Sequence, residues 1–234
     1  MTRVPSIRIR VVVDRPARAD GRFVLYWMTA CRRLEWNFAL DRAVEWAEQL
    51  RRPLAIVEAL GCAGRWRNDR HHAFVLQGMA DHRRCAAAAR VCYHPCVESR
   101  AGELETFFAA LAEQAAVVVA DDPPIAAPEH PGAFAHEAPA RIEAVDSNAL
   151  LPLRAAATPM ATAVAFRRFL QKTLPDYLTD APRADALGVA RLRPPEALPG
   201  EWSRRWPATD ERLLAADRAA LGRLPIDHSV EPVE

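Results

Sequence analysis

The feature that most limits the possible folds is the stretch of residues 23–60, where two apolar runs flank one amphipathic segment. The first run reads FVLYWM, and the second, LAIV, follows Pro53. Between them, apolar residues recur at three- and four-residue steps with charges in between, which predicts a helix. Pro53 ends this helix because proline lacks a backbone donor and clashes with the preceding turn. The pattern is strand, helix, strand, and a right-handed crossover makes the two strands parallel.

The same alternation continues along the chain and predicts one α/β domain with a doubly wound sheet of five parallel strands. After the first two strands we expect three more, at residues 90–93, 116–120 and 142–146, with helices at 68–90 and 103–115. We expect an irregular lead-in, in which the Val11–Val13 run could form an edge strand. Beyond the domain we expect a helix at 161–174 and a proline-rich tail, both packed on the domain. The predicted units are therefore residues 1–22, 23–152 and 153–234.

Composition excludes several classes of protein. The 31 basic and 30 acidic residues give a net charge of +1, so nothing draws the whole chain to nucleic acid or membrane. No apolar run approaches the roughly 18–20 residues of a membrane helix. Because residues 1–10 are polar, we expect no secretory leader. Five cysteines without framework spacing fit a reducing compartment. We expect a cytoplasmic protein.

Four ordered segments carry a resemblance to a known family. YWM at residues 26–28 with RLEWNFAL at 33–40 resembles the first strand-helix-strand unit of class II DNA photolyases. Trp36 and Phe38 depart from that family's usual residues. Three further matches follow in order: RHHAFVLQGM at 70–79, VVADDPPI at 118–125 and VDSNALLP at 145–152. Residues 177–178 and 226–230 resemble the family's interdomain linker more loosely.

The resemblance implies a Rossmann-like sheet of order 3-2-1-4-5, as in the N-terminal domain of photolyases. That domain often binds an antenna chromophore such as a deazaflavin, a folate or a flavin. The family's FAD-binding helical domain would begin near Glu234, so catalytic FAD is not expected in this chain. We expect a free-standing domain linked to DNA photorepair or light sensing, partnered by a separately encoded FAD domain. DNA contact would be weak or made through that partner, and the chain alone should not repair pyrimidine dimers.

The expected ligand site is the crevice past the carboxyl ends of the first and fourth strands, where crossovers reverse direction. Trp27 offers a stacking face, while Arg33 and Asn37 offer polar contacts to a ring edge. The alternatives are that Trp27 belongs to the core and that Arg33 pairs with Glu35 or Asp122. Asp122 and Pro123 could equally shape a turn. The predicted cofactor-binding residues are Trp27, Met28, Arg33, Asn37, Asp122 and Pro123.

A second candidate is a basic patch beside Trp66, which could hold an anionic ligand tail or a nucleic-acid phosphate. The alternative is a solvated loop and helix face. The spacing of Cys92, His94 and Cys96 is too loose for a metal site, so we expect buried strand cysteines instead. The patch consists of Arg65, Arg67, Arg70 and His71.

Two other functions stay open, because a fold does not fix a function. One is a small-molecule enzyme acting on a nucleotide or related metabolite, with acid, base or anion-binding roles for Arg33, His71, His72 and Asp122. The other is a non-catalytic interaction module whose crevice is filled by its own Trp and Arg side chains. Phosphate-loop, GxGxxG and nucleophile-elbow patterns are absent from the sequence.

Overall fold

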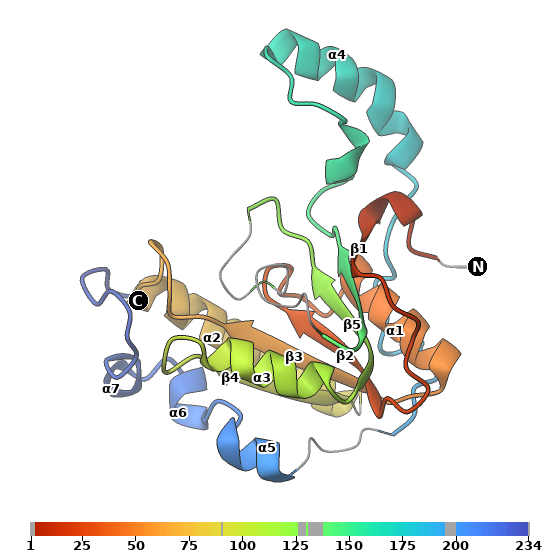
Figure 1. Cartoon of the computed structure of the whole chain (residues 1–234). Helices are drawn as coiled ribbons and strands as arrows, with labels where there is room; N and C mark the ends of the chain where they lie inside the picture. The colour runs from red at the N-terminus through yellow and green to blue at the C-terminus, as the bar shows by residue number, and fades with distance from the viewer. Residues whose placement is uncertain (1–2, 90, 126–129, 131–137, 195–199, 234) are drawn as a thin grey trace.

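The structure, a computed structural model, describes residues 3–89, 91–125, 130, 138–194 and 200–233. At its centre these residues form one six-stranded sheet, in the order β1-β6-β5-β2-β3-β4 (Figure 1). The strands are β1 Ile9–Val13, β2 Phe23–Met28, β3 Leu54–Leu60, β4 Cys92–Val97, β5 Ala115–Asp121 and β6 Arg141–Val145.

The sheet is mostly parallel rather than wholly parallel. β2 pairs in parallel with both β3 and β5, and the pairs β3–β4 and β5–β6 are parallel too. β1 is antiparallel to β6 at the edge. The expected sheet of five strands is therefore corrected to six. The sixth is β1, an edge strand that includes the Val11–Val13 run named above as a possible edge strand, although the rest of the lead-in was expected to be irregular. Its short valine run lies among basic residues, and its partner, β6, is more than 120 residues away.

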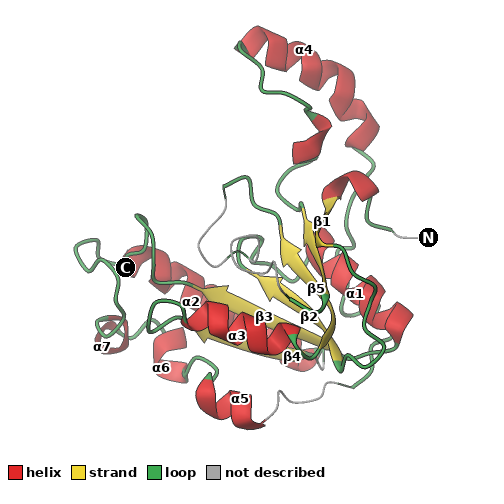
Figure 2. Cartoon of the chain, in the orientation of Figure 1, coloured by secondary structure: helices red, strands yellow, loops and turns green. Residues whose placement is uncertain are grey.

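Helices cover both faces of the sheet. α1 (Phe38–Leu50) and α2 (Asp69–Ala88) lie on one face, and α3 (Glu103–Ala112) covers the other (Figures 1 and 2). Asn37 starts α1, because its side chain accepts hydrogen bonds from two backbone N–H groups of the first turn. Asn68 caps α2 through one such bond, from the backbone N–H of His71. These helix starts place the loops that follow β2 and β3.

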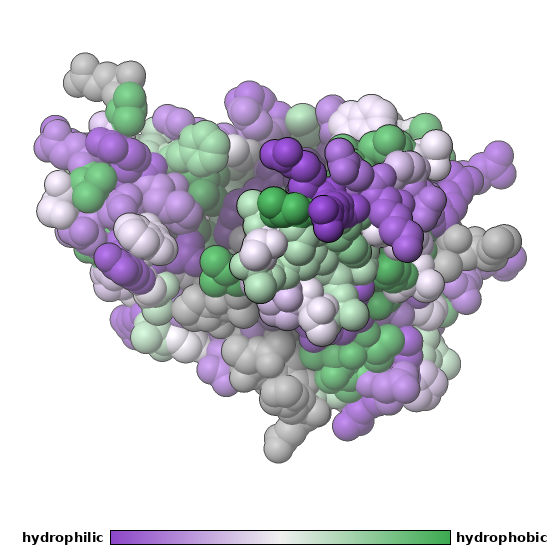
Figure 3. Space-filling view, turned by 90° about the horizontal axis from the view of Figure 1, so that it is seen from above, coloured by the Kyte–Doolittle hydropathy of each residue, from purple (hydrophilic) through white to green (hydrophobic). Residues whose placement is uncertain are grey.

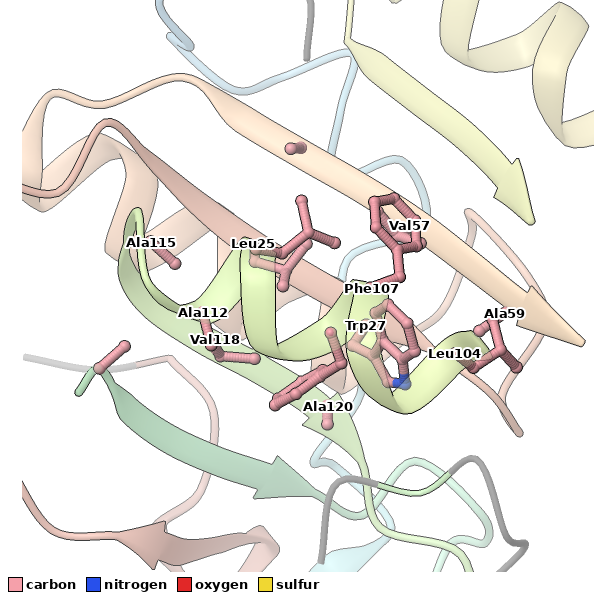
Figure 4. Packing of buried hydrophobic residues seen from close by; sticks show 14 of the residues in the cluster. Leu25, Trp27, Val57, Ala59, Leu104, Phe107, Ala112, Ala115, Val118 and Ala120 are labelled. Atoms are coloured by element: carbon pink, nitrogen blue, oxygen red, sulfur yellow. The ribbon is translucent and has the colours of Figure 1, made fainter. Parts of the chain in front are cut away.

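Every residue of β2 is buried, as expected for a strand covered on both faces. Because successive side chains point to opposite faces, Leu25 and Trp27 pack toward α3, while Tyr26 and Met28 pack toward α1. Figure 4 shows Trp27 beside Phe107 within the α3-side cluster. The two faces of the sheet thus carry separate cores.

The C-terminal third is not one packed tail. α4 (Ala163–Thr173) projects from the domain and contains no buried residue (Figure 1). Figure 3, seen from above, shows hydrophobic and hydrophilic residues mixed over the face from which α4 projects. The chain then returns to the domain, and Ala186 and Leu187 are buried against the α1-side core.

Short helices follow, and their apolar side chains pack on α2 and on the α3-side core. None of the described helices is both long and apolar enough to cross a membrane. The remaining helices are α5 Gly200–Arg205, α6 Glu211–Leu214 and α7 Arg218–Leu221, with 3-10 turns η1 Ser6–Arg8, η3 Leu153–Ala155 and η4 Leu174–Tyr177.

Candidate functional site

The crevice between β2 and β5 is occupied by the protein's own carboxylate. Asp121, the last residue of β5, accepts hydrogen bonds from the backbone N–H groups of Thr29, Ala30 and Cys31 at 2.9, 2.8 and 3.0 Å. The Tyr26 hydroxyl donates to the other oxygen of Asp121 at 2.8 Å. These amides are the donors that an anionic ligand group would use at a strand end. Asp121 therefore fixes the loop after β2 from within.

Three of the predicted ligand residues build this closed loop or the core beneath it. Trp27 is fully buried, with its ring edge-on to Phe108 at 5.1 Å between centroids, so the core alternative describes its place. Met28 is buried on the opposite face. Asn37 caps α1 and donates to the Tyr26 hydroxyl and to the carbonyl of Cys31.

The other predicted residues lie nearer the surface. Asp122 pairs with Arg10 at 2.6 Å and with Arg154. Burial raises the pKa of Asp122, but these two arginines outweigh it and hold the pKa below its usual value. Arg33 donates to the carbonyl of Ser147 at 2.7 Å rather than to a carboxylate. Pro123 is half-buried after the strand end.

An open space lies elsewhere, beside the second half of α2. A cavity of about 570 Å³, called here the large hollow, is bounded by the loop after β2, by α2 and by residues 185–188. A second cavity of about 360 Å³, the small hollow, lies against β3 and α2. His82 lines both. Lining the large hollow are Arg33, Leu34, Glu35, His82, Cys85, Ala88, Ala89, Asp185, Leu187 and Gly188.

The wall at His82 is built on a buried glutamate. Glu58, within β3, is fully buried. Its carboxylate accepts hydrogen bonds from the Arg32 guanidinium at 3.0 Å, from Nδ1 of His82 at 2.8 Å and from the Tyr93 hydroxyl at 2.6 Å. Four different parts of the chain therefore meet at one carboxylate, which we call the Glu58 cluster.

The Glu58 cluster has a defined charge state. Burial raises the pKa of Glu58, but the hydrogen bond from His82 and the charge of Arg32 outweigh it, so its pKa lies below the usual value. Burial and the nearby Glu58 charge raise the pKa of Tyr93 well above its usual value. The cluster thus holds an ionised carboxylate and a neutral phenol at neutral pH.

The basic patch is tied to its own surroundings. The Arg65 guanidinium lies over the Trp66 ring at 4.7 Å. Arg67 and Arg70 donate to the backbone carbonyls of Ala63 and Glu231. His71 lies edge-on to the ring of His72, whose pKa burial lowers to about 4. These contacts fix the loop after β3 and the C-terminal segment against α2.

The cysteine and histidine residues of β4 point into the core. Cys96 and His94 are buried. Burial raises the pKa of the Cys96 thiol to about 12 and lowers the pKa of His94 to about 4. Among the described residues, no three His, Cys, Asp or Glu side chains are grouped so that they could hold a metal ion.

The sequence analysis predicted the strands and the helix that carry the Glu58 cluster, but it did not predict that their side chains meet. One signal was available: Glu58 interrupts an otherwise apolar strand, LAIVEAL. A charge in a buried parallel strand needs partners. Their identity depends on side chains 24 and 35 residues further along the chain.

The fold and its hollows define a Rossmann-like α/β domain with space for a small ligand beside α2. In sequence, the chain is similar to the deoxyribodipyrimidine photo-lyase of Methanothermobacter thermautotrophicus, with 38% identity over 74 residues. The matched stretch is 32% of this chain and 17% of that protein, so it spans less than a fifth of the photolyase. No protein family model matches the chain. The similarity supports a photolyase-like relationship.

Proposed function

We propose that this chain is a photolyase-related domain that binds a planar chromophore or nucleotide-like ligand in the large hollow. The volume of that hollow, about 570 Å³, lies within the roughly 300–1,000 Å³ of small-molecule pockets. Its alanine and leucine walls suit a flat ring, and Arg33, Glu35, His82 and Asp185 supply polar groups for its edge. This location replaces the crevice between β2 and β5, which Asp121 fills.

The observation that carries this proposal is the buried Glu58, which lines the small hollow and holds His82 at the wall of both hollows. Burying a carboxylate in a strand costs several kcal/mol unless its partners are well placed. Such groups gather at functional sites more often than elsewhere, although purely structural networks also occur. Here one partner, His82, faces open space on its other side.

The photolyase-like similarity supports the wider role. A light-absorbing ligand in this domain would serve DNA photorepair or light sensing as an antenna. A separate chain would then supply the catalytic FAD and most of the DNA contact. The chromophores to test are a deazaflavin, a flavin and a folate.

The test combines colour with a matched pair of variants. Protein purified from its native host should absorb above about 300 nm, where Trp and Tyr do not. Ala88→Trp places a large ring in the large hollow and should weaken binding of the chromophore at least about tenfold. Ala87→Trp is the control, because Ala87 is an exposed neighbour on α2 that does not line the hollow.

Two results would overturn the proposal. One is a colourless protein that binds none of the three chromophores in equilibrium dialysis. The other is equal binding by wild type and Ala88→Trp, which would place the ligand outside the large hollow.

A further inference from the structure

His82 lines both hollows and carries a hydrogen-bond acceptor. An ionised carboxylate can only accept, so the 2.8 Å bond between Glu58 and Nδ1 of His82 requires a proton on Nδ1. In the neutral imidazole, Nε2 then carries the lone pair. Nε2 has no hydrogen bond to any residue that the structure describes. Glu58 and the packing of α2 therefore hold His82 at the wall of the hollows with Nε2 free to accept a hydrogen bond.

The two arginines of the loop after β2 are already engaged. Arg32 donates to Glu58 and, at 2.6 Å, to the carbonyl of Ala59. Arg33 donates to the carbonyls of Ser147 and Trp36. A ligand phosphate would have to displace these bonds before either guanidinium could receive it.

The charges around the hollows also disfavour an anion. Among the described residues that line the large hollow, one arginine, Arg33, stands against Glu35 and Asp185, which gives these residues a formal charge of −1. In the small hollow, Arg32 is offset by Glu58 and Asp81 by Arg84, so no unpaired cation remains among the lining residues that the structure describes. A phosphate carries about two negative charges near neutral pH and would be repelled.

We infer that the site selects an uncharged heterocycle with a ring N–H, which donates to Nε2 of His82, and rejects its phosphorylated form. The inference rests on the proposed function and narrows its ligand to a class. A flavin at the riboflavin level has both properties, since its ring carries an N–H group and its tail is neutral. The ring lies in the large hollow with its N–H at His82.

Matched probes separate the two parts of this inference. Lumiflavin and 3-methyllumiflavin differ only at ring nitrogen N3, which carries a hydrogen in the first and a methyl group in the second. Riboflavin and FMN differ only in the phosphate. We expect the methylated ring to bind at least about tenfold more weakly than lumiflavin, as expected when a buried acceptor loses its donor. FMN should bind at least about tenfold more weakly than riboflavin. Added salt should reduce this difference in affinity, because it screens the repulsion of the phosphate.

The variant His82→Phe keeps the size of the ring and removes the acceptor. It should lower lumiflavin affinity about tenfold and abolish the difference between lumiflavin and 3-methyllumiflavin. His228→Phe is the control, since His228 is also paired with a carboxylate but lies at the C-terminal segment. Nitrogen NMR of the wild-type protein is independent of any variant: it should show the proton of His82 on Nδ1 and a shift of Nε2 when riboflavin is added.

The outcomes distinguish the two proposals. If no planar ligand binds at all, the proposed function fails. If ligands bind but the methylated and unmethylated rings bind equally, or FMN binds as tightly as riboflavin, the inference fails while the proposed function stands. A His82 proton found on Nε2 would also overturn the inference.

Discussion

Two buried carboxylates flank β2, and their partners differ in kind. Asp121 on β5 is satisfied mainly by backbone amides of one loop. Glu58 on β3 is satisfied by side chains from three other parts of the chain. Each backbone amide that binds Asp121 has a single N–H group, so it has no further donor with which to bind a ligand. The imidazole bound to Glu58 keeps a second nitrogen, and its residue, His82, lines both hollows.

The difference shows what a general rule of the fold can and cannot locate. In open parallel sheets ligands commonly bind where crossovers reverse direction, here between β2 and β5. In this chain the side chain of Asp121 fills that position, and open space lies on the α2 side instead. Backbone topology selects the candidate edge, and individual side chains decide which part of it stays open.

The largest expected effect is the loss of Asp121. Asp121→Ala leaves three backbone N–H groups, two of them buried, and the Tyr26 hydroxyl without their acceptor. We expect the free energy of unfolding to fall by about 4 kcal/mol, measured by urea denaturation. Asp122→Asn is the control: its arginine partners are partly exposed to water, so the loss should be about 1 kcal/mol. Equal losses for the two variants would contradict a structural role specific to Asp121.

Removing the charge of Glu58 should have the next largest effect. Glu58→Gln leaves Arg32 without its counterion and should lower the free energy of unfolding by about 3 kcal/mol at pH 7. The folded-state pKa of Glu58 is depressed, so its carboxylate contributes stability above its ordinary value of 4.5. That contribution is lost as the pH falls through the lower folded-state value.

The stability gap between wild type and Glu58→Gln should therefore be full at neutral pH and shrink below about pH 4.5. Urea denaturation at a series of pH values measures it. A gap that stays constant into strong acid would show that the ion pair is not its source.

Trp27 provides a test of which side of the sheet holds the ligand. Trp27→Phe should lower the free energy of unfolding by about 2 kcal/mol, because its ring packs against Phe107 and Phe108. Riboflavin binding should stay within about twofold of wild type, since the large hollow lies on the α1 and α2 side. Lost binding with little loss of stability would return the ligand to the crevice between β2 and β5.

The sequence predicted the central fold because its signals are local and repeated. The strand-helix-strand pattern of residues 23–60 appears as β2, α1 and β3. The apolar run before Asp121 appears as β5. β1 was harder to predict, since its valine run is short and its antiparallel partner is distant in sequence. The expected third strand begins at Arg90, which lies outside the described residues.

The site was less predictable, because it depends on which side chains meet. Trp27 and Asn37 looked like ligand groups by type and position, but the periodicity of β2 turns Trp27 toward α3, and Asn37 is used as a helix cap. Arg33 lies beside open space, but in the large hollow and not in the crevice for which it was predicted. The sequence contained one sign of the Glu58 cluster, which is a single acidic residue in an otherwise apolar strand.

The smallest expected effect concerns an exposed pair that resembles Glu58 and His82. Nδ1 of His228 lies 2.8 Å from Asp69, and its Nε2 lies 3.1 Å from the carbonyl of Leu224. Both partners accept, so they favour the doubly protonated ring, and the bond to Asp69 raises the pKa of His228 above 6.5. The stabilising contact is thus complete below pH 6.5 and is lost as the pH rises through the folded-state value.

In proton NMR titrations, Asp69→Asn should move the His228 midpoint down toward 6.5. Asp227→Asn, which removes a neighbouring acid with a smaller influence, should move it less. An unchanged midpoint in Asp69→Asn would mean that the pair does not form in solution. The contrast with His82 lies in the second nitrogen: a protein carbonyl occupies Nε2 of His228, so that ring has no acceptor for a ligand, whereas a cavity faces His82.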